Sequence, residues 1–103
     1  MYLTVFRNRK RPDIDRAAYE ADNARMEELA AAQPGFLSIK GFVADDGEVV
    51  AISEWESEEA ARAWGSHPEH ARVQARGRSD YYASYTLYSC PAPRVRRFHP
   101  EDQ

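Results

Sequence analysis

The sequence predicts one α+β domain in which helices cover one face of a four-stranded antiparallel sheet. A chain of 103 residues suits a single hydrophobic core. Four short segments are rich in β-forming residues, and a long segment without Gly or Pro separates the first two of them. With 14 Lys and Arg against 17 Asp and Glu, the formal net charge is only −3, which argues against a dedicated nucleic-acid-binding domain.

The first predicted strand and helix occupy the N-terminal third of the chain. Residues 2–8 alternate in polarity and are rich in β-forming residues, which indicates a strand. The segment from residue 14 to about residue 32 carries an apolar stripe, which predicts a long amphipathic helix with Asp13 as its N-cap. Gln33-Pro34-Gly35 ends that helix. Alternation places two sets of strand side chains on opposite faces: Leu3 and Val5 on one, and Tyr2, Thr4, Phe6 and Asn8 on the other.

A β-hairpin is predicted next, over residues 36–43 and 48–55. The two β-rich runs are joined by Asp45-Asp46-Gly47, and Asp-Gly between such runs is a strong hairpin signal. The first run is expected to place Leu37, Ile39 and Val43 on one face.

Two short helices are expected after the hairpin. Ser57 is a typical N-cap, and the acidic residues that follow it suit the positive end of a helix dipole. Residues 65–68 include Gly65 and Pro68 and break this helix. A second helix is predicted over residue 69 to about residue 76, with Gly77 as its stop.

The last predicted strand covers residues 81–90, and residues 91–103 form a polar tail outside the domain of residues 1–90. Alternation predicts Tyr82 and Tyr88 on one face of this strand and Tyr81 and Tyr85 on the other. The resulting order, β-α-β-β-α-β, is the ferredoxin-like arrangement. Its helices cover only one face of the sheet, yet the strands carry apolar side chains on both faces. We therefore expect a homodimer formed through the uncovered face of the sheet.

Several short motifs follow one another in a characteristic order: Pro34-Gly35-Phe36, Glu54-Trp55-Glu56-Ser57, Ala63-Trp64, His67-Pro68-Glu69-His70, Gln74 and Gly77-Arg78. In this order they resemble the antibiotic biosynthesis monooxygenase (ABM) domain family, including its haem-degrading-monooxygenase-like branch, over about residues 1–90. The resemblance implies a dimeric α/β barrel with a pocket between the helices and the sheet of each protomer. Some members of this family oxygenate polycyclic aromatic polyketides with O2 and no metal or flavin, and others bind and degrade haem.

The residues present disfavour the haem branch. In that branch an Asn on the first strand, a Trp at the end of a helix and a more distant His form the site. Trp64 matches the Trp, but Val73 or Gln74 stands at the place of the His. Phe6 stands at the place of the Asn, and Asn8 lies two residues further along. We expect no tightly bound cofactor and no metal site.

Three residues are candidates for catalysis. His70 titrates near neutrality and could accept a proton from a phenol or an activated methylene, although it could equally cap a helix. By the resemblance, Trp64 would position an aromatic ring, and the amide of Asn8 could donate a hydrogen bond to a carbonyl. Phe6, Trp55, Gln74 and Tyr82 are candidates for substrate binding, with core packing as the alternative for Trp55.

The leading hypothesis is a cofactor-independent monooxygenase that acts on an aromatic or polycyclic small molecule with O2. The alternatives are a haem-degrading enzyme and a non-catalytic dimer that binds a small ligand. Arg78 could pair with a substrate carboxylate, but an ion pair with Asp80 is favoured. The lone Cys90 and the lack of a long apolar segment favour a cytoplasmic protein without membrane partners.

Overall fold

The computed structural model describes residues 1–102, and its α+β architecture confirms the predicted fold class. The elements in chain order are β1 (Tyr2–Lys10), α1 (Arg16–Ala31), β2 (Phe36–Val43), β3 (Val49–Trp55), α2 (Glu58–Gly65), α3 (Pro68–Arg76) and β4 (Tyr82–Pro91). A single π-helical turn, Gly77–Tyr81, joins α3 to β4, and a short 3-10 helix spans Pro100–Asp102.

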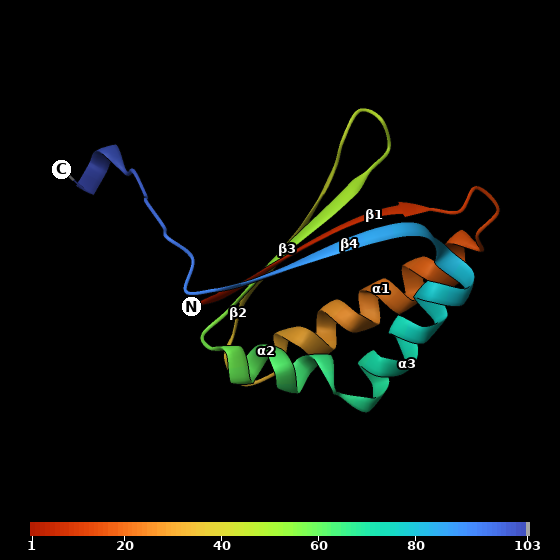
Figure 1. Cartoon of the computed structure of the whole chain (residues 1–103), viewed down its shortest axis with the longest axis horizontal. Coiled ribbons are helices and arrows are strands. Elements are labelled where there is room, and N and C mark those ends of the chain that lie inside the picture. Colours follow the sequence, from red (N-terminus) through yellow and green to blue (C-terminus); the bar gives the residue numbers. More distant parts are fainter. Residues whose placement is uncertain (103) are drawn as a thin grey trace.

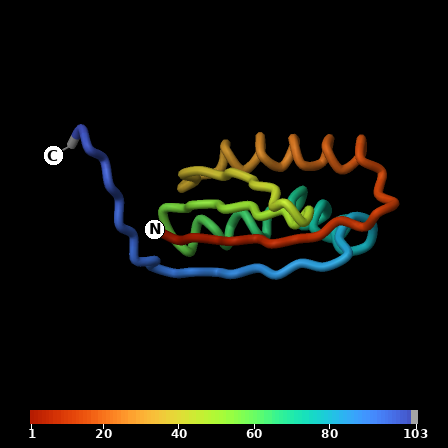
Figure 2. Tube along the Cα trace, turned by 90° about the horizontal axis from the view of Figure 1, so that it is seen from above, coloured from red at the N-terminus to blue at the C-terminus, as the bar shows by residue number. Residues whose placement is uncertain are grey.

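The four strands form one antiparallel sheet in the order β2-β3-β1-β4. Figure 1 shows α1, α2 and α3 together on one side of this sheet, so the other side has no helical cover. Beyond β4, Figure 2 shows the C-terminal segment leading away from the body of the molecule. Within residues 1–102, no helix has the length and apolar character needed to cross a membrane.

Helix α1 begins two residues later than the sequence suggests. Asp15, not Asp13, is its N-cap, and the Asp15 carboxylate accepts a hydrogen bond from the backbone N–H of Ala18 at 3.0 Å. In this helix Ala18 is exposed, whereas Tyr19 lies on the side that faces the sheet and is half-buried. Tyr19 therefore belongs to the inner face of α1.

Helix α3 ends at Arg76 with Gly77 as its C-cap, as predicted, but Gly77 is not in the left-handed conformation common at such caps. Its backbone is right-handed helical, with φ −56° and ψ −49°, and the chain continues into the π-helical turn. Space explains the glycine: a Cβ at this position would lie 2.6 Å from Cε2 of Tyr82. The glycine therefore lets the Tyr82 ring lie against the backbone, and it is not needed for a left-handed turn.

Two irregularities in the sheet change which side chains share a face. A shift of register between Arg9 and Lys10 pairs Asn8 with Tyr85 and Lys10 with Tyr82. Because cross-strand partners share a face, Tyr82 and Tyr85 lie on the same side, and the predicted separation of these two tyrosines is wrong.

The second irregularity lies between Phe36 and Ser38 in β2. It places Phe36 opposite Trp55 and Ile39 opposite Ser53, so Phe36 and Ile39 share the helix-covered side. The strict alternation predicted for Leu37, Ile39 and Val43 therefore does not hold along the whole strand.

The tightest part of the core lies where β1 begins and β3 ends. Trp55 is only 1% exposed, and the ring of Phe36 meets it edge-to-face at 5.5 Å between centroids. The buried residues of this cluster are Tyr2, Ala30, Trp55 and Trp64, with Met26, Leu29, Phe36, Ala60 and Ala61 packed against them. A cavity between the sheet and the helices begins at this cluster, where Tyr2, Trp55 and Trp64 line it, and extends along the sheet to Tyr82 and Tyr85.

Candidate functional site

The cavity between the sheet and the helices has a volume of about 400 Å³, and we call it the aromatic cavity. Residues from all four strands, all three helices and the π-helical turn line it. A pocket with mostly aromatic walls and a few polar groups suits a flat apolar ligand. Its aromatic members are Tyr2, Phe6, Tyr19, Trp55, Trp64, Tyr81, Tyr82 and Tyr85.

His70 is fixed against Trp64 on one wall of this cavity. The two rings stack with centroids 4.1 Å apart and an angle of 13° between their planes. Nδ1 of His70 lies 2.9 Å from the backbone carbonyl oxygen of Trp64. A carbonyl oxygen only accepts hydrogen bonds, so Nδ1 must carry the proton and Nε2 must present a lone pair. The fold thus selects the tautomer in which Nε2 can act as a base.

Burial keeps this imidazole in its neutral form. The pKa of His70 is lowered below its ordinary value of 6.5, mainly because burial disfavours the charged ring. The hydrogen bond to the Trp64 carbonyl opposes that effect, and the charge of His67 adds to it. Gln74, one helical turn later, places its amide nitrogen 3.4 Å from Nε2 and can donate to it. The cavity is therefore lined by a neutral base whose Nε2 lone pair can accept a hydrogen bond from Gln74.

The two tryptophans have different surroundings. Trp55 is in the core, and its indole N–H donates to the hydroxyl of Ser53 at 3.3 Å. Trp64 packs near Trp55 with ring centroids 6.4 Å apart, and one face of its indole is covered by His70. Both side chains line the cavity, but a ligand can stack only on the part of Trp64 that the imidazole leaves uncovered.

Lys10 lies at the far end of β1, beside the tyrosine-lined part of the cavity. Its ammonium donates to the side-chain oxygen of Asn8 and lies 4.7 Å from the ring centroid of Tyr19 and 5.5 Å from that of Tyr82. Burial lowers its pKa to about 8, with a further contribution from the charge of Arg16. Among the ion pairs of residues 1–102, none involves Lys10.

The tyrosines of this wall remain protonated at neutral pH. The pKa of Tyr82 is raised, chiefly by burial and also by Tyr19, and the pKa of Tyr19 is raised by burial as well. Phe6 meets the rings of Tyr82 and Tyr85 at 5.4 and 5.3 Å. These phenols can donate hydrogen bonds to a bound ligand but are poor bases.

The structure brings together most of the residues that the sequence singled out. His70, Trp64, Phe6, Trp55, Gln74 and Tyr82 all line the aromatic cavity. Asn8 does not: it is 3% exposed, lies beneath Lys10 and is absent from the cavity walls that residues 1–102 form. Sequence reasoning missed Tyr19, Lys10 and the hydroxyls of Thr4 and Ser53, which hydrogen bond to each other on the cavity floor. Side chains two residues apart in a strand share a face, so the position of Asn8 in β1 could have pointed to Lys10.

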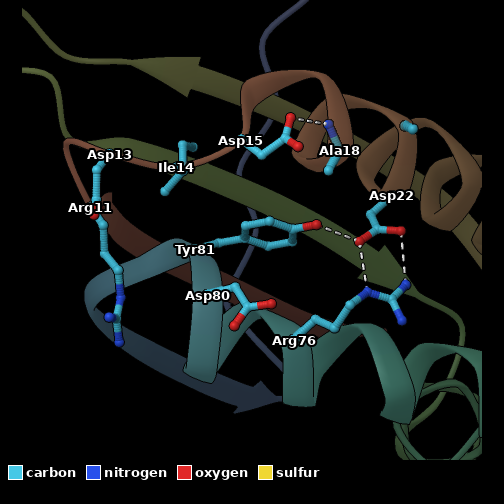
Figure 3. A pocket seen from close by; sticks show the side chains of 10 residues that line it. Arg11, Asp13, Ile14, Asp15, Ala18, Asp22, Arg76, Asp80 and Tyr81 are labelled. Atoms are coloured by element: carbon cyan, nitrogen blue, oxygen red, sulfur yellow. Dashed lines mark hydrogen bonds and ion pairs between the residues drawn. The ribbon is translucent and has the colours of Figure 1, made fainter.

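A second, more open hollow of about 610 Å³ lies between the start of α1 and the π-helical turn, and we call it the acidic hollow. Figure 3 shows Asp22 of α1 meeting Arg76 of α3 and Tyr81 of the π-helical turn. Arg76 donates to the Asp22 carboxylate at 2.8 and 3.0 Å, and the Tyr81 hydroxyl donates to it at 2.7 Å. These bonds, Arg76 first, hold the pKa of Asp22 below its usual range. The cluster joins α1 to the segment after α3.

No metal-binding site is evident in the part of the chain that the structure describes. Residues 1–102 bring no three His, Cys, Asp or Glu side chains together as a metal site requires.

Most of the chain matches a known protein family. The model of the antibiotic biosynthesis monooxygenase family matches residues 1–76. The uncharacterized protein YqjZ of Bacillus subtilis (strain 168) is 39% identical over 74 residues, which are 72% of this chain. The matching region spans only 65% of that relative's length.

Solved structures share the fold at lower identity. Rv0793 from Mycobacterium tuberculosis superposes with a TM-score of 0.79 at 22% identity, over 92% of this chain and 96% of that one. SnoaB, a cofactor-independent oxygenase from Streptomyces nogalater, superposes with a TM-score of 0.70 at 22% identity, over 96% of both chains. The structural likeness confirms the ferredoxin-like fold, and the match over residues 1–76 shows that the chain belongs to the antibiotic biosynthesis monooxygenase family.

Proposed function

We propose that this protein is a cofactor-independent monooxygenase of an aromatic or polycyclic small molecule, with His70 as the general base. One observation supports the proposal above all: a neutral imidazole, held in the tautomer that leaves Nε2 unprotonated, lines a cavity with aromatic walls. A base that is neutral at physiological pH can accept a proton from an activated methylene or phenol without first losing one. The name of SnoaB, a cofactor-independent oxygenase with the same fold, supports the same class of reaction.

The proposed chemistry is balanced without an added reductant. Nε2 of His70 takes a proton from a ring methylene of the substrate, and the carbanion passes one electron to O2. The substrate radical and superoxide combine into a peroxide with a new C–O bond. Cleavage of the O–O bond, with loss of the second methylene hydrogen, gives a carbonyl and one molecule of water. Trp64, Phe6 and Tyr82 would hold the aromatic rings, and Gln74 would release Nε2 when the substrate binds.

We infer that haem is not the ligand, because Val73 or Gln74 stands where the haem-degrading branch has its His. Val73, which lines the same cavity, has no atom that could ligate iron. We therefore expect haemin to bind weakly and without the Soret spectrum of a His-ligated haem. Tight stoichiometric binding that is lost in His70→Ala would make haem degradation the better proposal.

We also propose that two copies of the domain of residues 1–90 associate through the face of the sheet that lacks helices, with residues 91–103 as a tail. Phe42 and Tyr88 are 48% and 45% exposed, and the register of the strands places both on this face. Leu3, Val5, Val50 and Ile52 lie beside them. Sedimentation should give a dimer at micromolar concentration, and Phe42→Asp should weaken it. A well-folded monomer in the wild type would refute this assembly.

Oxygen consumption with an anthrone-type substrate, in the presence of a chelator, tests the proposed activity. Loss of a general base costs about a hundredfold to ten-thousandfold in rate, so His70→Ala should lose most of the turnover. His67→Ala is the matched control, because the His67 imidazole accepts a hydrogen bond from the N–H of Glu69 at the start of α3 and does not line the cavity. Full turnover in His70→Ala would remove the proposed base. No turnover with any electron-rich aromatic would favour a ligand-binding dimer.

A further inference from the structure

We propose that Arg78 binds a carboxylate of the ligand, so that the substrate is a flat aromatic acid of more than one ring. This inference rests on the proposed function, because it takes the aromatic cavity to be the substrate site. It adds a chemical requirement: the acidic group must lie at the end of the molecule remote from His70.

The Arg78 side chain is the unpaired cation of this cavity. It is exposed, lines the cavity and has no hydrogen bond or ion pair to another side chain of residues 1–102. Other arginines nearby are engaged: Arg76 pairs with Asp22 at 2.8 Å and Arg62 with Glu58 at 3.1 Å. The expected ion pair between Arg78 and Asp80 does not form within the described chain, and that prediction is wrong.

The backbone beneath Arg78 is held in place. The guanidinium of Arg11 donates to the carbonyl oxygen of Arg78 at 3.3 Å and to that of Tyr82 at 3.2 Å. These bonds tie the π-helical turn to the loop after β1. Arg78 therefore presents its guanidinium from a fixed point of the chain, and its planar fork matches the geometry of a carboxylate.

Helical spacing sets the length of the ligand. His70, Gln74 and Arg78 follow one another at intervals of four residues and all line the cavity. At a rise of 1.5 Å per residue, the eight residues from His70 to Arg78 span roughly 12 Å. A ligand of two or more fused rings can lie beside the imidazole and also reach the guanidinium with a carboxylate. Phe6, Tyr82 and Tyr85 provide aromatic wall for the intervening rings.

Equilibrium binding of two matched probes tests the inference. Anthraquinone-2-carboxylate and anthraquinone-2-carboxamide have nearly the same shape and differ in charge, and quenching of tryptophan fluorescence reports their binding. A charge-assisted hydrogen bond favours the carboxylate by about tenfold or more in the wild type. In Arg78→Gln that preference should disappear while the affinity for the carboxamide stays the same. Arg78→Lys should retain part of it.

Arg62→Gln is the matched control, because Arg62 lines the same cavity but is paired with Glu58. It should keep the wild-type preference. An equal preference in Arg78→Gln and the wild type, or none in the wild type, overturns the role of Arg78 but leaves the cavity intact if the carboxamide binds. Loss of carboxamide binding in Arg78→Gln would show a structural role instead. If neither probe binds the wild type, both this inference and the proposed ligand site fail.

Discussion

The aromatic cavity and the acidic hollow share a wall but differ in how their polar groups are satisfied. Asp22 and Tyr81 border both. In the hollow, the Asp22 carboxylate accepts hydrogen bonds from Arg76 and Tyr81, so its negative charge is already paired within the protein. In the cavity, the Nε2 lone pair of His70 and the guanidinium of Arg78 are available to a ligand. Volume alone would favour the hollow, whereas the chemistry favours the cavity.

Two consecutive tyrosines show the same contrast. Tyr81 is buried, and its hydroxyl donates to Asp22 in the hollow. Tyr82 turns its ring into the cavity, where it meets Phe6 and Tyr85. Burial raises the pKa of both phenols and both residues line the aromatic cavity, but only the Tyr81 hydroxyl donates to a carboxylate. The π-helical turn is what sends these neighbours in different directions, and such turns are common at functional sites.

The largest effect that separates the two regions should appear in the pH dependence of turnover. Because the pKa of His70 lies below its ordinary value, the base stays neutral to lower pH than a solvent-exposed histidine. Turnover should fall about tenfold for each pH unit below that pKa and be level from near neutrality upward. The measurement is kcat/KM between about pH 5 and 8. A midpoint above the ordinary histidine value would contradict the burial of His70.

Substitution of Gly77 tests how tightly the cavity wall is packed. In Gly77→Ala the new Cβ would lie 2.6 Å from Tyr82 Cε2, so either the ring or the turn must move. Such overpacking costs about 1–3 kcal/mol of unfolding free energy. Gly65→Ala is the control, because nothing lies within 4 Å of a Cβ there and alanine is the better helix former. Urea denaturation of both variants provides the comparison, and equal stability would mean that Tyr82 moves freely.

Asp22→Asn should weaken the structural cluster of the hollow. It removes the charge that Arg76 and Tyr81 bind, and for this partly exposed pair we expect a loss of about 1 kcal/mol. A carboxylate with a lowered pKa stabilises the fold above its unfolded value of about 4 and loses that contribution as the pH falls through the folded value. The stability difference between wild type and variant should therefore shrink in acid. Asp13→Asn is the matched control, because the Asp13 side chain lines the same hollow but makes no hydrogen bond or ion pair within residues 1–102.

A second pH effect on stability concerns Lys10, which lies close to the rings of Tyr19 and Tyr82. Its pKa is lowered from 10.5 to about 8, so between these values the unfolded chain holds a proton that the folded chain has lost. Stability from this group therefore rises with pH in that interval. Lys10→Met should flatten the rise between about pH 8 and 9.5, below the titration of the tyrosines. Thermal unfolding at several pH values measures the slope, and an unchanged slope would place the ammonium in water.

Much of the fold follows from local signals that the sequence carries openly. The polar and apolar alternation of residues 2–8, the Asp-Gly turn and the Ser57 N-cap each specify local structure with little help from the rest of the chain. Local hydrogen bonding and side-chain periodicity were enough for these predictions. The family resemblance pointed to Trp64 and the near-neutral titration of histidine pointed to His70, and both residues line the aromatic cavity.

Only the tertiary structure decided how the site is assembled. The register shift at Arg9 and Lys10 places Tyr82 and Tyr85 on one side, and alternation along an isolated strand cannot reveal a bulge that depends on its partner. The side-chain oxygen of Asn8 accepts a hydrogen bond from Lys10, and Asn8 does not line the aromatic cavity. This arrangement depends on the neighbouring helix, which brings Tyr19 against Lys10. The tautomer of His70 depends on the Trp64 carbonyl, which the chain brings within reach through the break between α2 and α3. Sequence therefore determined which elements form, whereas packing between them determined which polar atoms are left for chemistry.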